Sequence, residues 1–586
     1  MNFNAENSTI KGLLSNPRSY QIPRFQRDFS WDKSNYNEFL TDMLGQIKVD
    51  NDVFHTSQYY LGNMLFLGEN NSKFVEVIDG QQRLTTITIL LAAIRNKLFD
   101  TKDEQAKEYA NTIQNEYLVK KIDGQPQRKI QTYSSYPYFT QTIQDYYTKN
   151  NNVVPSTFEE ELLKETFNYF IEQLEKEKII RLFNRINKQN IPNESYINLL
   201  ISLRDQILES EVINIFSSDK EHVNRIYQNI NSKGKPLSQI DLIKNDIFSK
   251  IGKTDAGVDE ISDDWKEILE TLSKLDISMN EFFFHFWKAS YPKDRVTSTN
   301  LYLKYMNKFG NSTENELKKF IEFLKKSLDI YSNIIKPDPN AYKKQQYKLK
   351  EELLNALTKF HGVQIRIVLL ALYNSPLYSK VKNKKELDFL TSITDFHFIA
   401  FGSSLTIRTN KLSTPYNDFV KKVYYATKVE ELNTAMNELV NKLFSLVNEN
   451  DFIESFKQLS FSKKENTPYN YSSQYVIKRI ANILDNREYS PNDWSIEHII
   501  DEDKGDFAKN IGNLIVLETK INNELNKFKQ KNGSIEYSDK KKQYNSSSYT
   551  MVKDLIKDHE SFSKESEILC RAEQLAVYFW KNFNKN

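Results

Sequence analysis

The stretch WSIEHIIDEDKGDFAKNIGNLIVLETKINNELN, residues 494–526, decides how the C-terminal part of the chain folds. Residues 495–500 and 512–517 are short apolar runs that favour β-strands, and a glycine-containing polar loop separates them. Residues 520–527 follow with a helical spacing of apolar side chains. The order predicts a ββα unit.

Four polar side chains in this unit suit the hydrolysis of a phosphodiester bond. His498 is the predicted general base, because an imidazole titrates near neutral pH. Glu497 and Asn522 are the predicted ligands of Mg²⁺ or Mn²⁺, which prefer oxygen donors. Asn513 is predicted to hold the loop between the strands and to orient His498. Together they predict a catalytic pair, His498 and Asn513, beside a metal site.

A run of lysines follows the same motif. Cationic side chains beside a nuclease site are natural partners for DNA phosphates. The predicted DNA contacts are Lys520, Lys527, Lys529 and Lys531.

The segment resembles the HNH (His-Me finger) nucleases, and most closely the C-terminal HNH domain of GmrSD-type proteins, in which EHI, GNL and a lysine- and asparagine-rich helix occur in this order. The later Tyr544, Arg571 and Trp580 also fit. One departure is Asp501, which stands where the family usually has proline, two residues after the EHI isoleucine. The resemblance implies a ββα-metal domain that cuts DNA.

A second cluster, VIDGQQRLTT at residues 77–86, lies far upstream. Residues 59–68 and 73–78 are predicted strands, and residues 82–99 have apolar side chains at helical spacing. The DGQQR turn therefore joins a strand to a helix. Free N–H groups at a helix start favour an anion, Gly80 allows close approach, and Arg83 is suited to phosphate. The turn therefore predicts a phosphate-binding site, although the sequence contains no Walker motif.

Four separated segments strengthen this prediction: YQIPRFQRDFSW (20–31), YLGNMLFL (60–67), VIDGQQRLTT (77–86) and NINSKGKPLSQIDLIKNDIF (229–248). Together they resemble the ParB/sulfiredoxin-like N-terminal domain of GmrSD-type proteins, which binds and hydrolyses nucleoside triphosphates and takes part in sensing modified DNA. The resemblance implies nucleotide-binding roles for Gln26, Arg27, Asp79, Gly80, Gln81, Gln82, Arg83, Asn231, Lys233, Asp241 and Lys244. From the spacing alone, Asp241 and Lys244 could equally form a surface pair.

The length and composition of the chain further limit its possible folds and functions. The 586 residues are too many for one core. The predicted fold is α+β and mostly α-helical, with a ParB/sulfiredoxin-like domain (1–255, including a helical insertion), a helical middle region (256–455) and an HNH domain within a helical C-terminal domain (456–586). A net charge of +2 excludes a generally basic nucleic-acid coat, and one cysteine excludes an internal disulfide. No apolar run spans a bilayer, so a cytoplasmic protein without membrane contact is expected.

These features lead to one main hypothesis: an NTP-regulated, metal-dependent DNA endonuclease of anti-phage defence, which restricts modified double-stranded phage DNA such as glucosylated hydroxymethylcytosine DNA. A first alternative is a DNA nickase with the same sites, triggered by phosphorothioate marks or infection. A second is a ParB-like, nucleotide-switched DNA-binding protein with a degenerate nuclease. The DNA mark, the preferred nucleotide, the direction of coupling and the oligomeric state, a homodimer included, stay open.

Overall fold

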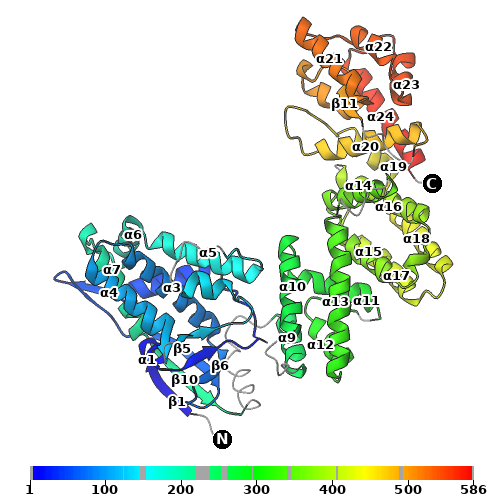
Figure 1. Cartoon of the computed structure of the whole chain (residues 1–586). Helices are drawn as coiled ribbons and strands as arrows, with labels where there is room; N and C mark the ends of the chain where they lie inside the picture. Colours follow the sequence, from blue (N-terminus) through cyan, green and yellow to red (C-terminus); the bar gives the residue numbers. More distant parts are fainter. Residues whose placement is uncertain are drawn as a thin grey trace. The chain divides into compact units, whose positions relative to one another are not determined.

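The computed structural model of the chain describes residues 4–24, 26–122, 125–145, 153–219, 238–251, 260–293, 295–338, 345–403, 405, 407–487 and 493–583. It divides into two compact units (Figure 1). The N-terminal unit comprises Met1–Phe283 and Thr297–Lys325, and the C-terminal unit comprises Phe284–Val296 and Lys326–Asn586. Most described residues are helical, so the prediction of an α+β, mostly helical chain is confirmed.

The N-terminal unit is built around one mixed sheet in the order β1-β10-β5-β6-β2-β9. The β10–β5, β6–β2 and β2–β9 pairs are parallel, and the β1–β10 and β5–β6 pairs are antiparallel. The strands are β1 (Asn4–Thr9), β2 (Ser19–Gln21), β5 (Tyr60–Leu67), β6 (Phe74–Asp79), β9 (Ile130–Gln131) and β10 (Glu211–Ser217). Two small hairpins lie outside this sheet: β3 (Lys48–Asp50) with β4 (Val53–His55), and β7 (Val119–Ile122) with β8 (Gln125–Arg128).

Helix α3 (Gln81–Phe99) is the central helix of this unit, and nearly all of its residues are buried. It follows β6 directly through Gly80, whose φ of 94° is a left-handed conformation that favours glycine. The strand–turn–helix predicted around DGQQR is therefore confirmed. Six further described helices pack around α3, either directly or through one another: α1 (Ile10–Ser15), α2 (Lys33–Gly45), α4 (Glu104–Thr112), α5 (Phe158–Gln173), α6 (Lys176–Asn187) and α7 (Tyr196–Glu209).

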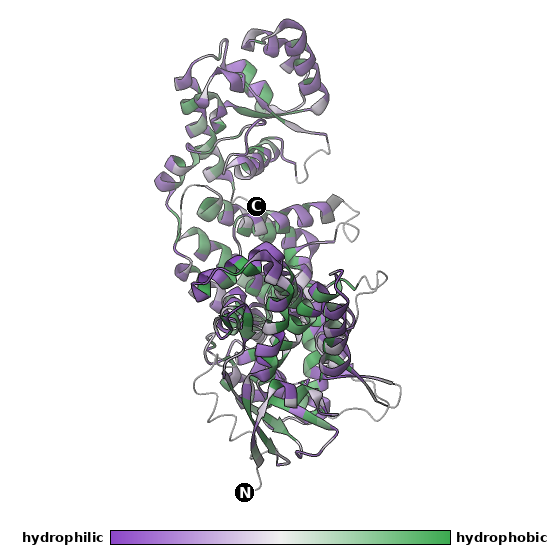
Figure 2. Cartoon of the chain, turned by 90° about the vertical axis from the view of Figure 1, so that its left-hand side faces the viewer, coloured by the Kyte–Doolittle hydropathy of each residue, from purple (hydrophilic) through white to green (hydrophobic). Residues whose placement is uncertain are grey.

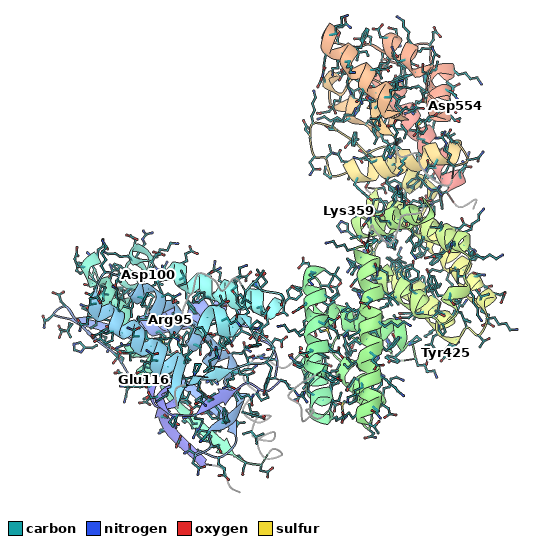
Figure 3. The ribbon with its side chains drawn as sticks, in the orientation of Figure 1. Arg95, Asp100, Glu116, Lys359, Tyr425 and Asp554 are labelled. Carbon is teal, nitrogen blue, oxygen red and sulfur yellow. The ribbon has the colours of Figure 1, made fainter. Side chains whose placement is uncertain are left out.

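A buried arginine ties α3 to its neighbours. The guanidinium of Arg95 (Figure 3) donates to the backbone carbonyls of Ile143 (3.2 Å) and Gln144 (3.0 Å), and it also contacts the side chain of Gln114. These acceptors lie on the π-helical turns η1 (Ile113–Leu118) and η2 (Phe139–Gln144). Because a buried guanidinium needs acceptors for its N–H groups, the two irregular turns are fixed to the helix by one side chain.

Further helices continue this unit. Helix α9 (Gln239–Lys250) begins after Ser238, whose side chain accepts from the Asp241 N–H while the Asp241 carboxylate accepts from the Ser238 N–H. This capping box makes Ser238 the N-cap of α9. The remaining helices are α10 (Glu260–Lys274), α12 (Leu301–Phe309) and parts of α11 (Met279–Ser290) and α13 (Glu314–Ile335), which the boundary between the units crosses.

The C-terminal unit is almost entirely helical. Its helices are α14 (Gln345–Lys359), α15 (Ile365–Asn374), α16 (Asn383–His397), α17 (Asn410–Tyr425), α18 (Val429–Phe444), α19 (Glu449–Phe456), α20 (Asn470–Leu484), α21 (Thr519–Asn532), α22 (Tyr537–Tyr544), α23 (Thr550–Asp558) and α24 (Glu565–Asn582). The single described sheet of this unit is the hairpin of β11 (Ser495–His498) and β12 (Leu514–Leu517). The hairpin and its helices share one apolar core.

Hydrophobic residues lie on one side of most helices and hydrophilic residues on the other (Figure 2), as expected for helices with one buried face. No helix among the described residues is long and apolar enough to cross a membrane.

Two histidines, His285 and His397, are buried in the C-terminal unit. Burial lowers the pKa of His285 and of His397 to about 3. His285 Nδ1 lies 2.7 Å from the Tyr331 hydroxyl, and His397 Nε2 lies 3.0 Å from the Tyr416 hydroxyl. Both imidazoles are therefore neutral hydrogen-bonding groups at neutral pH.

We expect the replacement His397→Gln to reduce the loss of stability in acid. Below about pH 6.5 the unfolded histidine binds a proton, whereas the folded one does so only near pH 3. Its contribution to stability is therefore complete above pH 6.5 and is lost as the pH falls. Between pH 7 and pH 5 the variant should lose about 2 kcal/mol less unfolding free energy than the wild type. Denaturant titrations of both proteins at pH 7 and pH 5 measure the unfolding free energies. An equal loss of unfolding free energy in the variant and the wild type would contradict the prediction.

Candidate functional site

The C-terminal candidate site lies on the hairpin and on helix α21. Strands β11 and β12 pair antiparallel, with Ser495 opposite Leu517 and His498 opposite Leu514. Both strands are shorter than predicted, because residues 499–513 form a loop with short 3₁₀ turns. Gly512 in this loop allows α24 to pack closely, since a Cβ there would lie 1.9 Å from the Ile568 carbonyl oxygen.

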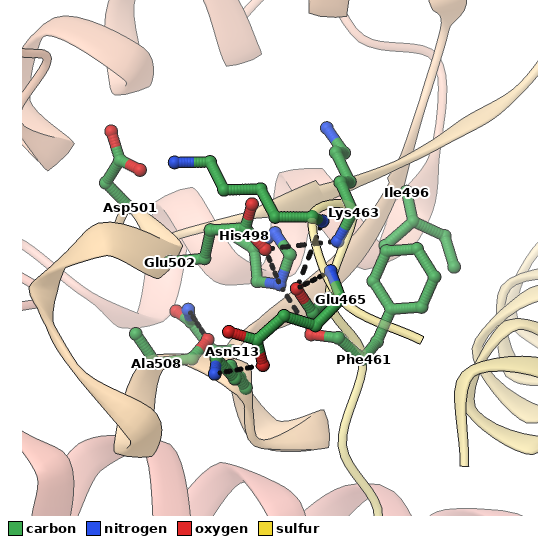
Figure 4. A network of polar contacts seen from close by, with 12 residues as sticks. Phe461, Lys463, Glu465, Ile496, His498, Asp501, Glu502, Ala508 and Asn513 are labelled. Atoms are coloured by element: carbon green, nitrogen blue, oxygen red, sulfur yellow. Dashed lines mark hydrogen bonds and ion pairs between the residues drawn. The ribbon is translucent and has the colours of Figure 1, made fainter. Parts of the chain in front are cut away.

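Asn513 holds the loop through its fully buried amide. Its Oδ1 accepts from the Ile500 N–H at 2.8 Å, and its Nδ2 donates to the carbonyls of Ile500 (2.7 Å) and Ala508 (2.6 Å). The Ile499 N–H donates to the Asn513 carbonyl at 2.8 Å. One side chain therefore fixes the chain on both sides of the loop, immediately after His498 (Figure 4).

His498 is buried between a carbonyl and a carboxylate. Its Nε2 lies 3.0 Å from the Phe461 carbonyl oxygen and 3.8 Å from Glu502 Oε2, and its ring stacks on the Phe461 ring. Because a carbonyl only accepts, Nε2 carries the proton and Nδ1 is left as the basic nitrogen. Burial lowers the pKa of His498, although the Phe461 carbonyl and the nearby carboxylates act in the opposite direction. The imidazole is therefore neutral at pH 7.

Glu497 is a buried carboxylate with two ammonium partners. Its Oε1 accepts from Lys540 Nζ at 2.6 Å, and its Oε2 lies 3.5 Å from Lys463 Nζ. Lys540, on α22, is itself buried and also donates to the His498 carbonyl. A buried carboxylate needs compensation by positive charge, and Lys540 supplies it from within the fold.

Asn522 lies on the same face of the hairpin as Glu497. Its Nδ2 donates to Ser495 Oγ at 2.8 Å and to the Ile496 carbonyl at 3.2 Å. Since alternate residues of a strand share a face, Glu497 lies on the side of β11 where Ser495 contacts Asn522. The Asn522 Oδ1 accepts only a long bond of 3.4 Å, from Asn526, among the described contacts.

The donors fit a divalent cation of the oxygen-preferring type. The Glu497 carboxylate and the Asn522 Oδ1 are both buried and share one face, and Glu497 already binds a cationic group. No group of three or more His, Cys, Asp or Glu side chains that could hold a metal occurs in the described part of the chain. A metal here would therefore need water or substrate oxygens to complete its shell, and Lys540 would have to release Glu497.

Asp501, which replaces the proline of the family pattern, forms an ion pair with Lys529. Burial alone would raise the pKa of Asp501, but the Lys529 ammonium and the Asp503 N–H lower it overall. Lys529 also lies 3.1 Å from Asp503. Of the four lysines predicted to contact DNA, Lys529 is thus engaged within the fold, whereas Lys520, Lys527 and Lys531 are exposed on α21.

The N-terminal turn uses its glutamines to brace a neighbouring loop. Gln81 Nε2 donates to the Arg27 carbonyl at 2.8 Å. Gln82 donates to the Asp28 carbonyl at 3.1 Å and accepts from the Ser30 N–H at 2.8 Å. Gln26, on that loop, donates to the Ile78 carbonyl at 3.0 Å. Three predicted nucleotide ligands therefore bind backbone groups of their own domain.

Arg83 points toward strand β5. Its guanidinium donates to the carbonyls of Leu61 and Asn63 (2.6 Å for the latter) and lies 3.6 Å from the Asp79 carboxylate. Gly62 makes room for it, because a Cβ there would lie 2.5 Å from Arg83 Nη1. Burial lowers the pKa of Arg83. The two charged residues of DGQQR thus pair with each other.

Lys244 joins α9 to the same loop. Its Nζ lies 2.7 Å from Asp28 Oδ1. Burial lowers the pKa of Lys244, but the carboxylates of Asp28, Glu159 and Asp241 raise it overall. Asp241 caps α9 and Lys244 is buried against Asp28, so Asp241 and Lys244 do not form the surface ion pair that their spacing also allowed. The predicted residues Asn231 and Lys233 lie outside the described residues.

Glu159 is a buried acid that sequence analysis did not single out. Its Oε1 accepts from the Phe29 N–H at 2.8 Å. Burial, and then the charge of Asp28, raise the pKa of Glu159 to about 8. Together with Arg27, Gln81 and Gln82 it lines a cavity of about 10 Å³. This volume holds about one water molecule, so a nucleotide would require the turn and the loop to separate.

The roles of three side chains within the fold were not predicted, for the same reason in each case. Lys540 stands in a lysine run, Glu159 in a glutamate run and Lys463 in a Lys-Lys pair, and such runs usually form solvated surfaces. The helical spacing of Tyr537, Lys540 and Tyr544, all buried on α22, is the signal that could have identified Lys540.

We expect Asn513→Ala to destabilise the C-terminal unit. The replacement leaves the Ile500 N–H and two carbonyls without their partner in a buried loop, at a cost of about 1–3 kcal/mol for each unsatisfied group. Thermal unfolding of the full chain measures the effect. The matched control is Asn523→Ala, at an exposed position of α21. Equal unfolding temperatures for both variants would contradict the role of Asn513 in the loop.

Residues 10–248 match the family model described as GmrSD restriction endonuclease, N-terminal domain. The match covers five of the six strands of the sheet, all except β1, together with the DGQQR turn and most of helix α9. No curated protein matches the chain. The N-terminal part of the chain is therefore similar to the GmrSD restriction endonuclease N-terminal domain.

Proposed function

We propose that the protein is a GmrSD-type DNA endonuclease of phage defence, whose C-terminal unit cleaves the phosphodiester bond with the help of Mg²⁺ or Mn²⁺. The observation that carries the proposal is the ββα arrangement, in which Glu497 and Asn522 share a face and a neutral His498 follows on the same strand. The N-terminal family match supports a restriction endonuclease independently.

His498 would act as the general base. The Phe461 carbonyl fixes the proton on Nε2, so Nδ1 can take a proton from water during attack on phosphorus. Burial keeps the imidazole uncharged at neutral pH, which leaves this nitrogen available. Asn513 would position His498, because it fixes the loop that begins at the end of β11.

Glu497 and Asn522 would hold the metal. The cation would neutralise charge on the scissile phosphate and on the leaving oxygen. Lys540 would keep Glu497 in place before the metal binds, since it donates to that carboxylate and to the adjacent His498 carbonyl. The exposed Lys520, Lys527 and Lys531 on α21 would contact phosphates of double-stranded DNA.

The N-terminal unit would make the reaction dependent on a nucleoside triphosphate and on modified DNA, as the family resemblance implies. The Gln81 and Gln82 side chains hold the loop that contains Arg27 and Asp28. A nucleotide that enters at the start of α3 would compete with these bonds, because the cavity there is small. We propose that this opening is how the nucleotide regulates cleavage.

The function is tested with His498→Ala. We expect the variant to cut plasmid DNA at least about 100-fold more slowly, because removing a general base typically costs two to four orders of magnitude. The assay uses Mg²⁺ or Mn²⁺ with and without each NTP, on unmodified, glucosylated hydroxymethylcytosine and phosphorothioate DNA. His55→Ala, at an exposed position of β4, is the control. Cleavage at the wild-type rate by His498→Ala would show that another group is the base.

The metal site is tested with Lys540→Met. Without metal we expect the variant to lose about 3–5 kcal/mol of stability, because Glu497 keeps a buried charge without its closest partner. Mn²⁺ should then raise the unfolding temperature of the variant more than that of the wild type. Lys541→Met is the control, since Lys541 bonds to the His559 carbonyl instead. If Mn²⁺ does not change the unfolding temperature of Lys540→Met, Glu497 is not a metal ligand.

A further inference from the structure

A wide groove lies in the N-terminal unit, apart from the DGQQR turn. Its volume is about 1320 Å³. Segments distant in the sequence line it: the chain before and along β2, the loop between β5 and β6, the ends of β8 and β9, and helix α10. Sites for single small molecules usually have volumes of about 300–1,000 Å³, so this groove has room for more than one.

Three aromatic side chains are exposed in this groove. Phe74 is 55% exposed, Tyr133 38% and Tyr136 56%. Gln21 Nε2 donates to the Tyr133 hydroxyl at 2.5 Å, which orients one of the rings. Exposed apolar side chains are normally scattered singly over a protein surface. Several exposed aromatic rings in one groove therefore indicate a binding surface. Flat rings of this kind stack on nucleobases.

The groove lining is rich in cationic side chains, two of which pair with carboxylates: Arg128 with Asp145 and Lys266 with Glu160. Its lining contains four cationic residues, Arg18, Lys73, Arg128 and Lys266, and one acidic residue, Asp263. The chain as a whole has a net charge of only +2. Arg18 is held by the Ser72 carbonyl (3.1 Å) and Arg128 by Asp145 (2.9 Å), so both guanidinium groups are fixed, whereas Lys73 is exposed. Fixed and exposed cations in one groove suit a phosphate backbone.

Amide side chains complete the lining. Gln21, Asn71, Gln127 and Gln131 each offer a donor and an acceptor. Unpaired bases expose edges that such amides can bind, whereas the bases of a duplex are stacked and paired. The combination of rings, cations and amides is the one found where proteins bind single strands.

We propose that this groove binds an unpaired stretch of a DNA strand, with bases stacked on Tyr133, Tyr136 and Phe74 and phosphates at Lys73 and Arg128. The proposal rests on the proposed function for the choice of DNA as substrate. A strand fits better than a free nucleotide, because the cationic residues come from four separate segments and the volume exceeds that of a single-nucleotide site.

The test measures the binding of labelled oligonucleotides to the full chain by fluorescence anisotropy, in EDTA. The probes are a single strand, a fully paired duplex and a duplex with an unpaired stretch. Tyr136→Ala should weaken binding of the single strand and of the interrupted duplex by roughly 5- to 100-fold, the usual effect of removing one stacking ring. Binding of the paired duplex should not change. Phe158→Ala, at an exposed aromatic residue outside the groove lining, should have no effect.

Lys73→Ala provides a second readout. Removing one phosphate contact should lower the slope of log affinity against log salt by about 0.7 for a single strand. Equal affinities of wild type and Tyr136→Ala for every probe would overturn the proposal. Displacement of the oligonucleotide by ATP, with the same dependence on Tyr136, would overturn it in favour of a free nucleotide. The measurement in EDTA needs no cleavage, so its result is separate from the fate of the nuclease proposal.

Discussion

A carboxylate buried in a protein must be balanced by positive charge, and the Glu497–Lys540 pair meets this requirement at the centre of the candidate nuclease site. The two side chains are 7% and 4% exposed, and their closest atoms are 2.6 Å apart. Removing one partner of such a pair is costly, because the other partner is left as a buried charge without compensation. The pair therefore holds Glu497 in one orientation, and under the proposed function a divalent ion would have to displace the ammonium group from it.

At both candidate sites a primary amide side chain holds a loop by hydrogen bonds to its backbone. In the C-terminal unit, Asn513 binds backbone groups of Ile500 and Ala508, and in the N-terminal unit, Gln82 binds those of Asp28 and Ser30. A primary amide suits this use because it offers donors and an acceptor in one plane. Loops that carry reactive groups are in this way held in a single conformation without regular secondary structure.

The periodicity of the sequence was enough to predict the strand, turn and helix around DGQQR and the strand–strand–helix order around His498. These elements have strong local signals: β-prone runs, a glycine at a turn and apolar residues at helical spacing. Side-chain directions could not be predicted in this way. Arg83 looked free to bind phosphate but donates to the β5 carbonyls, and Glu159 looked like part of a solvated run but is buried. Both outcomes depend on contacts with distant segments.

The central claim is that Glu497 and Asn522 hold a divalent cation once Lys540 has moved. Anomalous X-ray diffraction from crystals of the full chain soaked in Mn²⁺ tests it most directly. The account predicts a Mn²⁺ peak within about 2.3 Å of a Glu497 carboxylate oxygen and of Asn522 Oδ1, with the Lys540 ammonium displaced from Glu497. No peak at this position, with Lys540 still bound to Glu497, would contradict it.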